Sequence, residues 1–229
     1  YILLFFALIA IRAAGQNDQW KTDWANLKKY AESNRVLPPP AKNEKRVVFM
    51  GDSITEFWKY TDSNFFAVNP YIGRGISGQT TSQMLVRFRP DVIALKPSVV
   101  VILAGINDIA ENTGPITLET VFGNIVSMAQ LARSNQIRVV LCSVLPANDF
   151  PWRKGLGPAD KVIRLNTMIR SWGGKNNVVY LDYYSAMVDN RKGLDKRYGD
   201  DGVHPNLAGY QIMEPLVQDA IKRALKKNQ

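Results

Sequence analysis

The chain of 229 residues contains one histidine and one cysteine, two side chains that proteins often use for metal binding and nucleophilic chemistry. With one cysteine, no disulfide can form within the chain. A zinc site rich in histidine or cysteine is excluded because it needs three or four such ligands, whereas a site built from carboxylates stays open. The sequence also lacks a glycine-rich phosphate loop followed by lysine. We therefore predict no metal ion and no other cofactor.

The single cysteine, Cys142, ends an apolar run at residues 138–142. A cysteine becomes a nucleophile when a neighbouring basic group favours its thiolate form, and no basic or acidic partner lies beside this one. We interpret Cys142 as a small residue of the core.

Long apolar runs are also scarce, and the longest lies at residues 1–11. It is too short to span a bilayer, and the small residues Ala13 and Gly15 follow it as in a secretory cleavage site. We interpret residues 1–15 as a signal peptide that lacks its start, with the mature chain beginning near Gln16. The protein is then secreted or periplasmic, with no stable membrane insertion after signal removal. A buried N-terminal strand or a membrane anchor is the alternative.

Charge of one sign is in excess, with 29 Lys and Arg against 20 Asp and Glu, giving a net charge of +9. The basic residues are nevertheless spread along the chain, and the densest group is Lys222, Arg223, Lys226 and Lys227. We interpret this group as the solvated face of a C-terminal helix, where it also suits the helix dipole. No nucleic-acid motif accompanies it, so we expect no nucleic-acid partner. The oligomeric state stays unknown.

Apolar runs alternate with longer segments of helical pattern. The expected strands lie at residues 47–50, 71–72, 99–103, 138–142 and 178–181, and the expected helices at 79–88, 116–134, 159–173 and 206–227. Buried strands separated by helices are typical of a parallel sheet covered on both faces. We predict an α/β fold, a three-layer α/β/α sandwich with a five-stranded parallel sheet in flavodoxin-like order. Such sheets hold their ligands at the carboxyl ends of the strands.

The N-terminal part has a different pattern. Residues 18–34 carry apolar side chains at helical spacing, and three prolines from Pro38 to Pro40 follow them. We expect residues 16–44 to form a helix and a stiff proline-rich linker, and residues 45–229 to form the main domain.

Polar residues that could do chemistry follow the expected strands. Ser53 comes just after the strand at 47–50, and His204, the sole histidine, lies three residues beyond Asp201. A serine hydroxyl needs a base to remove its proton, and histidine is the side chain suited to this near neutral pH. Asp201 is close enough in sequence to accept a hydrogen bond from the second ring nitrogen and fix the tautomer. These three residues predict a serine hydrolase, whose activity should fall on the acid side as His204 becomes protonated.

Acyl transfer also requires donors for an oxyanion. The candidates are the backbone N–H groups of Ser53 and Gly78 and the side-chain amide of Asn107. Glycine at position 78 lets the main chain approach a substrate closely.

Four segments together resemble the four blocks of the SGNH/GDSL hydrolase superfamily, in the order of that family. They are Gly51–Thr55, Gly78, Gly105–Asp108 and Asp201–Pro205, and the resemblance covers residues 46–215. The first block reads GDSIT instead of GDSL, which leaves the serine unchanged.

The resemblance implies an SGNH hydrolase fold and hydrolysis of carboxylic esters by acyl transfer to water. It implies Ser53 as nucleophile, Asp201 and His204 as the rest of a triad, and Gly78 and Asn107 as oxyanion donors. Taken one at a time, several of these residues also fit structural roles. Ser53 could cap a helix, Asn107 could form a turn, and His204 before a proline could begin a helix. For Asp52 and Asp108 we favour a role in capping or turns over direct chemistry.

The substrate is less clearly indicated. Trp58, close behind the serine, and Trp152, in a long loop after the fourth strand, could stack on a sugar or hold an acyl chain. We expect the neighbouring Phe57 to pack against the domain instead. A secreted domain without a long apolar lid favours a carbohydrate O-acetylesterase, with a glycan or small-molecule ester as substrate. A short-chain lipase, lysophospholipase or general esterase is the alternative, and a catalytically idle carbohydrate-binding module is an alternative of another class.

Overall fold

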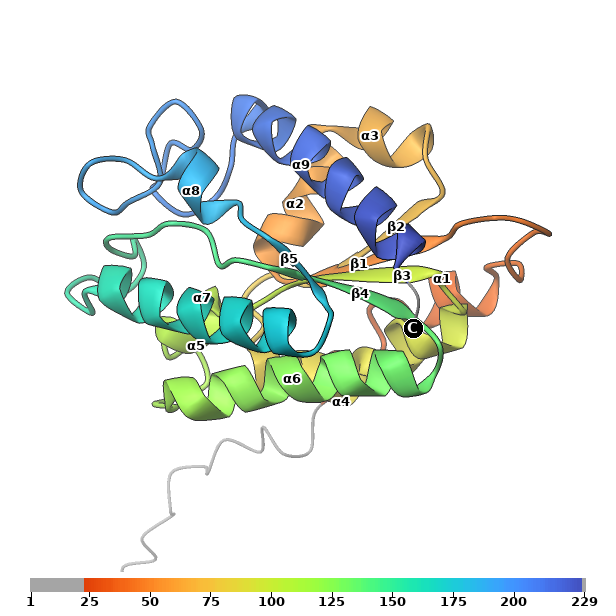
Figure 1. Ribbon diagram of the computed structural model, residues 1–229. Coiled ribbons are helices and arrows are strands. Elements are labelled where there is room, and N and C mark those ends of the chain that lie inside the picture. The colour runs from red at the N-terminus through yellow and green to blue at the C-terminus, as the bar shows by residue number, and fades with distance from the viewer. Residues whose placement is uncertain (1–22, 228–229) are drawn as a thin grey trace, which may run out of the picture.

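Five parallel strands form one sheet in the computed structural model, which describes residues 23–227 (Figure 1). The strands are β1 (Val47–Gly51), β2 (Tyr71–Gly75), β3 (Val99–Leu103), β4 (Arg138–Cys142) and β5 (Val179–Leu181). Their order is β2-β1-β3-β4-β5, and each neighbouring pair is parallel. This is the flavodoxin-like order that the sequence predicts, so the expected fold class is confirmed.

The central strands are buried on both faces, which explains why they appear in the sequence as unbroken apolar runs. Every residue of β1 and of β3 is buried. In β4, Cys142 is buried, and this burial raises the pKa of its thiol. The interpretation of Cys142 as a core residue is therefore confirmed.

Helices cover both faces of the sheet (Figure 1). One face carries α2 (Ser53–Thr61), α3 (Ser63–Ala67), α8 (Tyr184–Met187) and α9 (Leu207–Lys226). The other carries α4 (Thr81–Asp91), α6 (Leu118–Ser134), α7 (Pro158–Lys175) and the short α5 (Ile106–Ile109), with α1 (Ala31–Arg35) packed against α4. Of the basic residues expected on a solvated face, Lys222, Arg223 and Lys226 lie exposed on α9, whereas Lys227 is half-buried just beyond its end. None of the helices within residues 23–227 combines the length and apolar character that a membrane span requires.

The expected N-terminal helix over residues 18–34 is confirmed only at residues 31–34 and is wrong over residues 23–30. Helical structure is limited to α1, and the residues before it form turns. Asn26 adopts a left-handed conformation with φ of 53°, and Asp23 Oδ2 accepts the N–H of Lys28 at 2.8 Å, so the chain bends repeatedly instead of coiling. The predicted signal peptide lies outside the described residues.

Candidate active site

Ser53 is the first residue of α2, and one residue separates it from the end of β1. That residue, Asp52, caps the helix: its Oδ1 accepts the N–H of Ile54 at 3.0 Å. The turn is so tight that a Cβ on Gly51 would lie 2.1 Å from Thr55 Oγ1. The strand and the helix thus place the serine at the carboxyl edge of the sheet and at a helix N-terminus.

A chain of hydrogen bonds joins Ser53 to His204 and Asp201, a pair that lies far from the serine in sequence. Ser53 Oγ lies 2.9 Å from His204 Nε2, and His204 Nδ1 lies 2.6 Å from Asp201 Oδ2. The order of atoms is that of a nucleophile, a base and an orienting carboxylate.

The loop before α9 is shaped by Asp201 itself. Its Oδ1 accepts the backbone N–H of Val203 at 2.9 Å and that of His204 at 2.8 Å, while Gly202 adopts φ of +81°. Partial burial works against ionisation of Asp201, but the hydrogen bonds from His204 and Val203 outweigh it and lower the pKa of the carboxyl group. The carboxylate is therefore charged at neutral pH, as an orienting partner of an imidazolium must be.

Gly78 and Asn107 lie on neighbouring segments that hydrogen bonds hold together. The Asn107 amide Nδ2 donates to the carbonyl of Gln79 at 3.1 Å. Asn112 Nδ2 donates to Asn107 Oδ1 at 2.9 Å and to the Gly78 carbonyl at 3.3 Å. Because the Oδ1 of Asn107 accepts from Asn112, the amide orientation is fixed, and its Nδ2 keeps a second hydrogen.

The backbone donors expected for an oxyanion are free in the part of the chain that the structure describes. Neither Ser53 nor Gly78 donates its N–H to a backbone carbonyl there, and Gly78 adopts φ of +76°. Glycine meets this conformation without the strain that a side chain would add.

The interpretation of Asp52 and Asp108 as capping residues agrees with the structure. Asp108 caps the start of α4 from a distant part of the chain, since its carboxylate accepts the N–H of Thr81 at 2.9 Å and the Thr81 hydroxyl at 2.6 Å. Asp52 caps α2, as described above, but its Oδ2 is buried with no hydrogen-bond partner among the described residues.

Two aromatic rings stand beside His204. The centroid of the Phe57 ring lies 5.2 Å from the imidazole centroid, and that of Trp152 lies 6.1 Å from it. Both rings are partly open to solvent, with exposed fractions of 39% for Phe57 and 45% for Trp152. The indole N–H of Trp152 donates to Asn112 Oδ1 at 3.2 Å, which ties the tryptophan to the amides described above.

The structure contradicts the expectation that Trp58 binds substrate and that Phe57 packs inward. Trp58 has an exposed fraction of 1% and stacks between Phe65 and Tyr210 in the core. The physical reason is helical geometry, because Trp58 lies four residues after the buried Ile54 and shares its face of α2.

Sequence reasoning missed Asn112 and Gln79. Both contact Asn107 or Gly78, but neither belongs to a motif. Apart from the pair Asn112 and Asn107, which are five residues apart, the partners are distant in sequence. Only the contacts in the folded chain reveal them. Across residues 23–227, no three His, Cys, Asp or Glu side chains are grouped to share a metal ion.

The structure has a three-layer α/β/α fold with a hydrogen-bonded Ser–His–Asp chain at the carboxyl edge of its sheet. These two features are those of the α/β class of serine hydrolases. Comparison with known proteins agrees. The model of the GDSL-like lipase/acylhydrolase family matches residues 49–212, and the chain belongs to this family, part of the SGNH/GDSL superfamily. It is accordingly an esterase, a hydrolase that acts on ester bonds.

Solved structures give the same assignment. A Bacteroides fragilis protein described as an acylhydrolase is 52% identical, with a TM-score of 0.88 over 90% of this chain and 100% of that one. A GDSL-like lipase of Bacteroides thetaiotaomicron is also 52% identical, with a TM-score of 0.86 over 88% and 100%. An acetylxylan esterase of Geobacillus stearothermophilus, 19% identical over 84% and 99%, shares the fold with a TM-score of 0.63. Comparison with curated proteins gave no match.

Proposed function

We propose that the protein hydrolyses carboxylic esters with Ser53 as nucleophile, His204 as general base and Asp201 as orienting carboxylate. The observation that carries this proposal is the unbroken hydrogen-bond chain from Ser53 Oγ through the imidazole to Asp201 Oδ2. No other histidine is present in the sequence to serve a nucleophile.

In the proposed reaction, His204 Nε2 takes the hydroxyl proton of Ser53 as Oγ attacks the ester carbonyl carbon. The tetrahedral intermediate collapses, the bond to the alcohol oxygen breaks, and the alcohol leaves with the proton from His204. Water then attacks the acyl-serine, with His204 again as base. The carboxylic acid is released, and the hydroxyl of Ser53 is regenerated.

The oxyanion of each tetrahedral intermediate is assigned to the N–H groups of Ser53 and Gly78 and to the Asn107 side-chain amide. Support comes from the two backbone donors, which have no carbonyl partner within the described residues, and from the fixed orientation of the amide. Loss of one such donor typically reduces kcat by about 10²- to 10³-fold.

For the substrate we propose acetyl esters of carbohydrates. The partly exposed rings of Phe57 and Trp152 beside His204 offer apolar faces suited to a sugar ring. Acetylxylan esterases among the solved structures use the same fold, at identities too low to indicate a shared substrate. The apolar residues 1–11 support a secreted or periplasmic location, where such glycans occur.

The test measures hydrolysis of p-nitrophenyl acetate, butyrate and octanoate, and of acetylated xylo-oligosaccharides, by the wild-type protein and Ser53→Ala. We expect turnover to be strongest on acetyl esters and to fall by at least about 10⁴-fold in the variant, because no other hydroxyl can take the place of Oγ. Circular dichroism of the variant should match the wild type.

Other outcomes identify the alternatives. Fastest turnover of octanoate would favour a lipase or lysophospholipase, and full activity of Ser53→Ala would overturn the mechanism. Glycan binding without turnover by the folded wild-type protein would identify an idle binding module.

A further inference from the structure

We propose that the N-terminal strap, residues 23–35, positions the loop of Gly78 for catalysis. This loop comprises residues 76–80, between β2 and α4, and the strap acts on it through the buried residues Gln79 and Arg87. This inference rests on the proposed function, in which Gly78 and Asn107 stabilise the oxyanion. The strap precedes residues 49–212, the part of the chain that matches the family model, so it is a support that the family motifs do not include.

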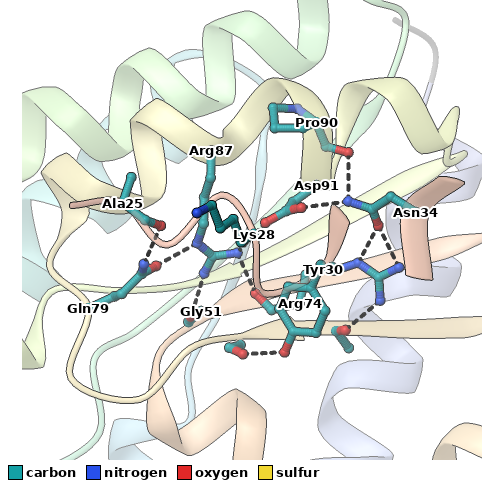
Figure 2. A network of polar contacts seen from close by, with 12 residues as sticks. Ala25, Lys28, Tyr30, Asn34, Gly51, Arg74, Gln79, Arg87, Pro90 and Asp91 are labelled. Atoms are coloured by element: carbon teal, nitrogen blue, oxygen red, sulfur yellow. Dashed lines mark hydrogen bonds and ion pairs between the residues drawn. The ribbon is translucent and has the colours of Figure 1, made fainter. Parts of the chain in front are cut away.

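Gln79 connects the strap directly to the side-chain amide of Asn107. Its side chain is buried, and its Nε2 donates to the carbonyl of Ala25 in the strap at 2.7 Å. Its Oε1 accepts from Arg87 Nε at 2.5 Å (Figure 2). Its own carbonyl accepts from Asn107 Nδ2 at 3.1 Å. The residue next to Gly78 is therefore held on both its side chain and its main chain.

Arg87 is fully buried in α4 and anchors this connection to the sheet (Figure 2). It donates to the carbonyls of Gly51 at 2.9 Å and Arg74 at 2.8 Å, and to Asp91 Oδ2 at 3.0 Å. Gly51 ends β1 before the serine, and Arg74 lies near the end of β2 before the loop. One guanidinium, whose donors are arranged rigidly, thus sets the spacing between the nucleophile turn and the Gly78 loop.

The strap also holds the first part of that loop. The Tyr30 hydroxyl donates to the carbonyl of Gly75, where the loop begins. Lys29 Nζ pairs with Glu56 Oε1 at 2.8 Å, and Glu56 Oε2 accepts the N–H and the hydroxyl of Ser77 at 2.7 Å and 2.6 Å. The chain on both sides of Gly78 is therefore attached to the strap.

The far end of the strap is fastened to the same network. Asn34 Nδ2 donates to Asp91 Oδ1 at 2.7 Å, and Asn34 Oδ1 accepts both Nε and Nη2 of Arg74 (Figure 2). Arg87 also contacts both Asp91 and Arg74, so the strap and this arginine form one connected network.

External fixation matters here because glycine in the loop gives the main chain extra conformational freedom. A displacement of about 1 Å in a catalytic group can cost about 10²-fold in rate. The strap therefore contributes to transition-state binding without contacting the substrate.

The test replaces Gln79 by methionine, which has a similar shape and lacks both hydrogen-bonding groups. The matched control is Asn166→Leu, because Asn166 is also a buried amide, bonded to Val144 N–H and carbonyl at 2.7 Å and 2.9 Å. We measure kcat and KM on p-nitrophenyl acetate and the affinity for phenylboronic acid, which forms a tetrahedral adduct with a serine hydroxyl.

We expect Gln79→Met to lower kcat by about 10- to 100-fold with KM within about twofold, and to weaken boronate binding by a similar factor. Asn166→Leu should leave all three quantities near the wild-type values, even where it lowers the melting temperature. A merely structural role for Gln79 would lower the melting temperature in both variants and spare the boronate affinity, which would overturn the proposal.

A second variant, Tyr30→Phe, removes the hydroxyl that binds Gly75 and keeps the ring. It decides the matter if Gln79→Met does not fold, and we expect a smaller loss of kcat and of boronate affinity in the same proportion. If folded Tyr30→Phe and folded Gln79→Met both kept wild-type kcat and wild-type boronate affinity, the proposed role of the strap would be refuted. Activity that survives Ser53→Ala would instead refute the proposed function on which the strap rests.

Discussion

At the scale of single residues, Asp52 has the environment least suited to a charge. It is buried, one oxygen is bonded to the N–H of Ile54, and the other has no partner among the described residues. Burial raises the pKa of this carboxyl group from 3.8 to about 7; the nearby Asp108 adds to the rise, and the Ile54 hydrogen bond and His204 oppose it. Folding therefore favours the protonated form of Asp52, the residue that caps α2.

The raised pKa of Asp52 predicts how stability depends on pH. The folded state holds this proton more tightly than the unfolded state, so the stabilisation is complete below about pH 4 and is lost as pH rises through about 7. The loss amounts to about 1.4 kcal/mol per pH unit between these values. In Asp52→Asn the loss disappears, so the variant should gain stability relative to wild type between pH 5 and pH 8.

Urea unfolding of both proteins at the two pH values measures this difference. An identical difference in unfolding free energy at pH 5 and pH 8 would show that Asp52 does not titrate between them.

At the scale of elements, the approach of α2 to β2 depends on Gly75. A Cβ at this position would lie 2.3 Å from the N of Glu56 and 2.6 Å from the carbonyl oxygen of Asp52. These are main-chain atoms at the start of α2, which cannot yield as a flexible side chain can. The helix that carries Ser53 can lie where it does only because β2 ends in glycine.

We expect Gly75→Ala to push α2 away from β2, with a loss of several kcal/mol in stability and a displaced Ser53. Gly123→Ala is the matched control, since Gly123 lies in α6 and a Cβ there meets no atom within 4 Å. That variant should be neutral or more stable by about 0.5–1 kcal/mol. Thermal unfolding and kcat of both variants test the expectation, and equal effects of the two alanines would contradict it.

At the scale of the whole molecule, the parallel sheet and the main helices could be predicted from the sequence, because the central strands are continuous apolar runs separated by segments of helical pattern. The hydrogen-bonded serine, histidine and aspartate could also be picked out from the sequence, since one histidine leaves one candidate base. The strap could not, because its bends are held by contacts with Gln79 and other residues distant in sequence. The burial of Trp58 in place of Phe57 could have been predicted, because Trp58 lies four residues after Ile54 and the spacing indicates a shared buried face.

The whole molecule also sets the reactivity of Cys142. Its thiol lies in β4, between β3 and β5, and burial raises its pKa. We expect a thiol reagent such as Ellman's reagent to leave the native protein unmodified and to react over the same urea range in which circular dichroism changes. Labelling well below that range would mean that β4 opens without global unfolding.

The position of His204 beside Phe57 and Trp152 makes its imidazole a spectroscopic reporter. An untagged preparation has a single imidazole, so its ring protons form one isolated set of NMR signals. The two flanking rings, centred 5.2 Å and 6.1 Å away, impose ring-current shifts on those signals. A ligand that binds against these rings should shift that set of resonances, so binding beside His204 can be followed without any isotope label.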